Sequence, residues 1–111
     1  MEENKVKVTD FRNAEQEERS IGRWGRMRRT YLQEEHPDVF RSLMRSGKLR
    51  AELENLNGQA QDRLDQIVDQ MKAAEGITEA LKARDMMAWV RAMNSIRARA
   101  EEIILAELIY V

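Results

Sequence analysis

Residues 48–75 read KLRAELENLNGQAQDRLDQIVDQMKAAE, and this stretch decides the fold. Its apolar side chains recur every three or four residues, which places them on one side of an α-helix. They are Leu49, Leu53, Leu56, Ala60, Leu64, Ile67 and Met71. The spacing predicts one long helix close to a heptad pattern. A break at Asn57-Gly58 stays open, because glycine costs about 1 kcal/mol relative to alanine inside a helix.

A second long helix is predicted over residues 78–110. Thr78 is a favourable N-cap. The apolar stripe that follows includes Leu81, Met86, Trp89, Val90, Met93, Ile96, Ala100, Ile103 and Ile104. Because only Gly76 and Ile77 separate the two long segments, they should fold back on each other as an antiparallel hairpin.

Two short helices are predicted ahead of the hairpin, over residues 25–35 and 38–46. His36-Pro37 should end the first, since the residue before a proline is pushed away from helical geometry. Gly47 is a natural left-handed cap for the second. Residues 1–20 show little helical periodicity and are predicted to form an extended or flexible arm. We therefore expect an all-α fold, with residues 21–111 as a single domain in which the short helices pack on the hairpin.

The C-terminal stretch IILAELIYV (103–111) is apolar almost all round. A helix of this kind is usually buried on most of its sides. Burial in a second copy of the chain is the simplest arrangement, because two-fold dimers are the commonest oligomers. We predict a homodimer built as a helical bundle, with an interface made by Trp89, Met93, Ile96, Ile103, Ile104 and Leu108.

Composition excludes several classes of function. The chain has 111 residues, a size that suits one domain, no cysteine and a single histidine, His36. Disulfides, thiol nucleophiles and thiolate metal sites are therefore absent. No stretch approaches the roughly 20 apolar residues of a membrane span, and the acidic start lacks a signal peptide's apolar core. We expect a cytoplasmic protein that is not an enzyme and has no catalytic residues, metal, cofactor or membrane partner.

The nearly neutral total charge hides a basic segment. Residues 19–50 hold 9 basic and 3 acidic side chains, while the segments before and after are net acidic. The stretch RSIGRWGRMRR (19–29) has five arginines and no acid. One interpretation is an anionic partner such as nucleic acid, held by Arg19, Arg23, Arg26, Arg28, Arg29, Arg41, Arg45 and Lys48. The other is that Trp24, Met27 and Tyr31 are core and the arginines pair with acids of the long helices.

Asp62, Asp65 and Asp69 share one face of the predicted long helix. Paired carboxylates can hold Mg²⁺ or act in acid–base chemistry. The Glu-x-x-His pairs of bundle di-iron sites are missing, however. The pattern favours an exposed acidic stripe that docks a protein partner or the arginine segment. Glu107, within the apolar tail, is expected to be a buried partner for an arginine.

Several motifs resemble the small transposon-encoded TnpV family. The resemblance covers about residues 21–110 and keeps the order and spacing of IGRWGRMRR (21–29), YL (31–32), SGKL (46–49), TEALKA (78–83), Asp85, Trp89, MN (93–94) and AEEI (100–103). It implies an accessory product of mobile elements in Gram-positive bacteria, found beside recombinases and mobilisation genes. The resemblance carries no catalytic residues to transfer.

Two functional hypotheses follow. The first is a non-enzymatic accessory protein that binds nucleic acid or a recombination or regulatory complex through the arginine segment. The second is an antidefence inhibitor, resembling an anti-CRISPR protein, or an adaptor that binds a host nucleoprotein nuclease through the acidic and apolar faces of the hairpin.

Overall fold

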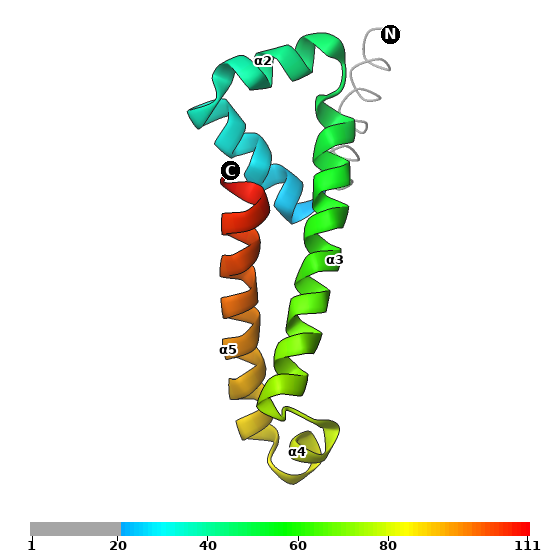
Figure 1. Cartoon of the computed structure of the whole chain (residues 1–111), viewed down its shortest axis with the longest axis vertical. Coiled ribbons are helices and arrows are strands. Elements are labelled where there is room, and N and C mark those ends of the chain that lie inside the picture. The colour runs from blue at the N-terminus through cyan, green and yellow to red at the C-terminus, as the bar shows by residue number, and fades with distance from the viewer. Residues whose placement is uncertain (1–20) are drawn as a thin grey trace, which may run out of the picture. The chain divides into compact units, whose positions relative to one another are not determined.

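The computed structural model describes residues 21–111, and every regular element in them is helical (Figure 1). A helix over residues 21–35 is followed by α2 (Pro37–Ser46), α3 (Leu49–Glu75), α4 (Glu79–Arg84), α5 (Met86–Ile104) and a π-helical turn, η1 (Leu105–Ile109). The all-α prediction is confirmed. The extended arm predicted for residues 1–20, and Arg19 with it, lies outside the described residues.

The chain divides into two compact units, residues 1–58 (unit 1) and 59–111 (unit 2), with the division inside α3. The helix α3 is continuous across Asn57-Gly58, so the open question of a break there is answered. Gly58 is exposed, and open space surrounds the position that a Cβ would take.

Unit 1 joins the helix over 21–35 to α2 and to the first ten residues of α3. His36 lies at the first junction, and Pro37 occupies the first turn of α2, as expected of a residue with no N–H to donate. Gly47 ends α2 in a left-handed conformation, φ 72°, and its N–H donates to the carbonyl of Met44. The core side chains of this unit are Ile21, Trp24, Leu32 and Leu53.

The first helix begins earlier than predicted. Residues 21–24 are already helical, and Gly22 lies within them at φ 73°. Only glycine adopts such a conformation without a steric penalty. The boundary predicted near Gly25 is therefore wrong, because helical residues already precede it.

Unit 2 is built on the pairing of α3 with α5. Arg63 of α3 bonds Glu107, and Glu75, twelve residues later on α3, bonds Arg99, eight residues earlier than Glu107. The two helices are therefore antiparallel, as predicted. Their facing sides bury Ala60, Leu64 and Ile67 from α3, and Ile96, Ala100 and Ile104 from α5.

The predicted single helix over 78–110 is wrong, because it breaks at Asp85. That residue ends α4 and caps α5, with its side-chain Oδ1 accepting the N–H of Ala88 at 3.1 Å. Aspartate favours such a cap over a helix interior, since its short carboxylate competes for backbone donors. Thr78 does cap α4, accepting the N–H of Leu81 at 3.2 Å, as predicted. A short helix, rather than a two-residue joint, thus connects the two long ones.

Within residues 21–111, no helix combines the length and the apolar character that crossing a bilayer requires.

Candidate functional site

Two glycines position the arginine-bearing helix against α3. Gly22 lies so close to α3 that a Cβ there would stand 2.3 Å from the side-chain nitrogen of Asn57. A Cβ on Gly25 would stand 2.9 Å from the backbone oxygen of Leu53. Leu53 and Asn57 are one helical turn apart on α3. The two glycines therefore allow the helix to pack closely against this turn, and larger residues at either position would prevent that contact.

A side chain from α3 bonds the backbone of this helix. The Oδ1 atom of Asn57 accepts the backbone N–H of Trp24 at 3.1 Å. This bond joins the turn that follows Gly22 to α3. Asn57 drew attention in the sequence only as part of a possible break. Its bond to Trp24 spans 33 residues, and no local signal predicts it.

The exposed side of the same helix carries the arginines. Arg23 and Arg26 are exposed, while Arg28 and Arg29 are half-buried at the edges. Each of the four takes part in at least one interaction. The guanidinium of Arg23 lies 4.6 Å from the centre of the Trp24 ring, and that of Arg28 lies 5.5 Å from the centre of the Tyr31 ring. These distances are typical of cation–π contacts.

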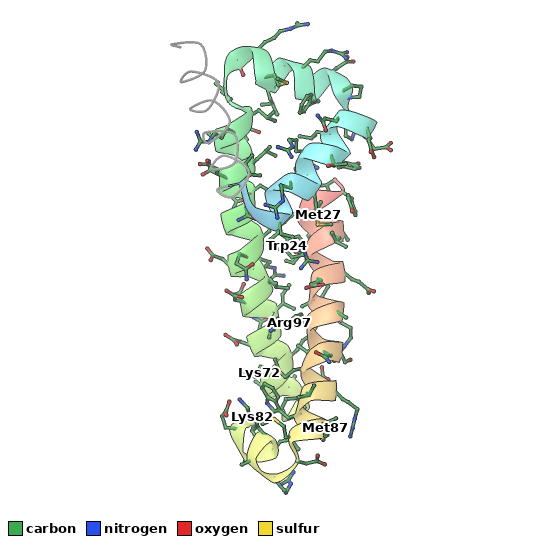
Figure 2. The ribbon with its side chains drawn as sticks, turned by 180° about the vertical axis from the view of Figure 1, so that it is seen from behind. Trp24, Met27, Lys72, Lys82, Met87 and Arg97 are labelled. Atoms are coloured by element: carbon green, nitrogen blue, oxygen red, sulfur yellow. The ribbon has the colours of Figure 1, made fainter. Side chains whose placement is uncertain are left out.

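The aromatic residues of the segment are not equivalent. Trp24 is only 2% exposed, so it is a core residue and cannot stack on the base of a bound nucleic acid. Met27 and Tyr31 are half-buried, and Figure 2 shows Met27 one turn along from Trp24 on the same helix. The interpretation of these three residues as core is confirmed for Trp24 alone. The basic surface therefore offers charge, with little aromatic stacking.

The remaining predicted cations of unit 1 lie on and after α2. Arg41 pairs with Asp38 one turn earlier. Arg45 and Lys48 are exposed, and neither side chain forms an ion pair with any residue in the part of the chain that the structure describes. Residues 21–58, the described part of unit 1, hold 8 basic and 5 acidic side chains and therefore carry a positive excess.

The predicted acidic stripe lies on the solvent side of α3 in unit 2. Asp62, Asp65 and Asp69 are all exposed. Asp65 accepts a hydrogen bond from the amide of Gln61 at 3.0 Å, and no ion pair reaches any of the three within residues 21–111. In the same residues, no group of three or more potential ligands comes together to hold a metal ion.

The residues predicted to form a dimer interface divide into two groups. Ile96 and Ile104 have 0% exposure within a single chain, so they have no surface to offer to a second copy. That part of the prediction is wrong, because α3 and α5 of one chain already cover their shared apolar stripe. Trp89, Met93, Ile103 and Leu108 are half-buried. The homodimer itself stays a prediction.

Two ion pairs join α3 to the C-terminal part of unit 2. The guanidinium of Arg99 donates two hydrogen bonds of 2.8 Å to the carboxylate of Glu75. These bonds hold the pKa of Glu75 below its ordinary value and raise the pKa of Arg99. Glu107 pairs with Arg63 at 3.4 Å but is 46% exposed. It does have an arginine partner, as expected, yet the predicted burial of the pair is wrong.

Comparison with known proteins identifies a family. A family model described as "Transposon-encoded protein TnpV" matches residues 5–109, nearly the whole chain. Neither the curated proteins nor the solved structures gave a match.

Proposed function

This chain belongs to the TnpV family of transposon-encoded proteins, and from that premise we propose that it is a mobile-element accessory protein that acts by binding the phosphate backbone of nucleic acid. The observation that supports this most directly is the exposed cationic surface of unit 1. Its members are Arg23, Arg26, Arg41, Arg45 and Lys48. Guanidinium groups bind phosphate in two-pronged fashion, and the sum of several such contacts gives affinity without base recognition.

Recognition through the phosphates of a nucleic acid, without contacts to its bases, fits the other features of this surface. Trp24 is buried, so stacking between its ring and a base contributes nothing. Asp38 lies in the first turn of α2. A helix that reads bases needs side chains that reach the base edges from this position, and the negative charge of Asp38 is repelled by the phosphates. The affinity should therefore depend strongly on salt and weakly on sequence, because phosphate contacts release counterions.

Fluorescence anisotropy of labelled oligonucleotides tests the proposal across a range of salt concentrations. Duplex DNA, single-stranded DNA and RNA each serve as probes. We expect Arg45→Ala with Lys48→Ala to lower affinity and to reduce the slope of log affinity against log salt by about 2 for duplex DNA. Arg26→Ala with Arg29→Ala should act in the same direction.

Arg91→Ala with Arg97→Ala is the matched control. It removes two exposed arginines from unit 2 and changes the net charge by the same amount. The slope should change less for this control than for the unit 1 variants. Equal losses of affinity in all three double variants would mean that the total charge of the protein, and not this surface, controls binding. The absence of binding to every probe at low salt would also refute the proposal.

A second candidate function rests on the acidic stripe of α3. Asp62, Asp65 and Asp69 present carboxylates to solvent without compensating cations in the described residues, a surface suited to a basic protein channel such as that of an RNA-guided nuclease. In that case a host protein should co-purify with the chain after nuclease treatment and be lost when the three become asparagine. The matched control changes Glu34, Glu35 and Glu52 to glutamine. If the asparagine triple variant still captures the host protein, the acidic stripe is not its binding surface.

A further inference from the structure

The indole nitrogen of Trp89 is an unexplained polar group in unit 2. Trp89 lies in the first turn of α5, and its Nε1 atom is buried without a hydrogen-bond acceptor in the part of the chain that the structure describes. Folded proteins rarely leave a buried donor unpaired, because the donor loses its bonds to water on burial. An acceptor from outside the chain would remove this penalty.

A cation lies beside this donor. The Nζ atom of Lys82, on α4, lies 4.6 Å from the centre of the Trp89 ring, a cation–π distance. Lys82 is half-buried, as is Lys72 on α3, and no carboxylate within residues 21–111 forms an ion pair with either. Figure 2 shows both lysines at the end of unit 2 where α4 connects α3 to α5. Ammonium groups without a carboxylate partner can donate hydrogen bonds to a bound anion.

We propose that Trp89 and Lys82 form a binding site for an oxyanion, the phosphate or carboxylate group of a ligand. An oxyanion has several acceptor oxygens, so one can accept the indole N–H while another bonds the ammonium. Hydrogen bonds to a charged group are stronger than neutral ones. A cation would be repelled by Lys82, and a neutral acceptor would leave the lysine charge uncompensated.

Because the indole nitrogen is buried, a ligand reaches it only when the side chains that cover it move. Lys82 has a flexible four-carbon stem and three donors. Its ammonium can therefore leave the ring face and turn toward an anion at the ring edge. Lys72 adds a second positive charge at the same end of the unit, which raises the local anion concentration. This site lies in unit 2 and does not depend on the nucleic-acid proposal for unit 1.

The indole resonances of the full chain test the site directly by ¹H–¹⁵N correlation spectroscopy. Inorganic phosphate and acetate are titrated separately, against sodium chloride at matched ionic strength. We expect a saturable downfield shift of the Trp89 indole proton. The phosphate and acetate arms distinguish the two sources of oxyanion.

Variants of Lys82 separate binding from a general salt effect. Lys82→Met should weaken binding by at least about tenfold, the expected loss for one hydrogen bond to a charged group. Lys82→Arg should retain it, and the matched control Arg91→Met should leave the titration unchanged. A Trp89 indole that shows no saturable shift in the wild-type chain overturns the proposal. So does an equal response in Lys82→Met, because Lys82 would then have no part in holding the anion.

Discussion

Replacing Gly22 by alanine should destabilise the protein more than the same replacement at Gly47, although both glycines have nearly the same positive φ angle. Their φ angles are 73° and 72°. An L-residue in this region costs about 1–2 kcal/mol, partly offset by about 0.4–1 kcal/mol because alanine restricts the unfolded chain. Conformation alone therefore predicts a loss of about 1 kcal/mol at either position.

The difference between the two positions comes from their surroundings. Nothing lies within 4 Å of a Cβ on Gly47, whereas a Cβ on Gly22 would stand 2.3 Å from the Asn57 side chain. If Asn57 stays in place, the overlap costs about 1–3 kcal/mol. If Asn57 swings away, it loses its hydrogen bond from Trp24, which costs about 1 kcal/mol. Gly22→Ala should therefore exceed Gly47→Ala by about 1–3 kcal/mol.

Urea denaturation followed by far-ultraviolet circular dichroism measures both free energies of unfolding. The double variant Gly22→Ala with Asn57→Ala adds an internal check. Because the second change removes the obstructing side chain, the double variant should lose less stability than the sum of the two single changes. Equal losses for Gly22→Ala and Gly47→Ala, to within about 0.5 kcal/mol, would show that the contact between Gly22 and α3 is not as tight as the structure places it.

Three further predictions concern α3 and its contacts. Gly58→Ala should raise the free energy of unfolding by about 0.5–1 kcal/mol, because Gly58 is exposed within a helix and its Cβ position is open; a loss in urea denaturation would contradict this. Asn57→Ala should lower the free energy of unfolding by about 1 kcal/mol, because the N–H of Trp24 loses its acceptor. Asn57→Asp keeps an acceptor oxygen and should lower the free energy of unfolding by less. Equal losses of stability for the two variants in urea denaturation would rule out the hydrogen bond as the cause. Glu75→Gln should be less stable than wild type at neutral pH, since the folded-state pKa of Glu75 lies below its ordinary 4.5. Stability from a lowered pKa is present above 4.5 and is lost as the pH falls through the folded-state value, so melting temperatures measured from neutral to acid pH should converge for the two proteins. A gap that persists at the acid end would show that the carboxylate charge is not responsible.

The basic surface illustrates which parts of a candidate site can be predicted. The positive excess of residues 19–50 follows from residue type, and the core position of Trp24 was one of two interpretations that the sequence left open. Helical spacing placed Met27 and Tyr31 fully on the buried side, yet both are half-buried. The buried side is rotated toward Gly25 and Leu32, because the absence of a side chain on Gly25 lets α3 approach there. Spacing gives the period of a face but not the direction from which its partner comes.

The sequence by itself determined the helices, because spacing of three and four, caps at Thr78 and Gly47, and the proline after His36 are local features that act on neighbouring residues. Only the tertiary structure decided that Asn57 would bond Trp24, that Asp85 would break the last helix, and that Ile96 and Ile104 would be covered within one chain. The bond of Asn57 and the burial of Ile96 and Ile104 depend on groups brought together from separate segments. The break at Asp85 depends on a balance between two local conformations, an interior helical residue and a helix cap, that packing resolves. Contacts of that kind leave no periodic signal along the chain.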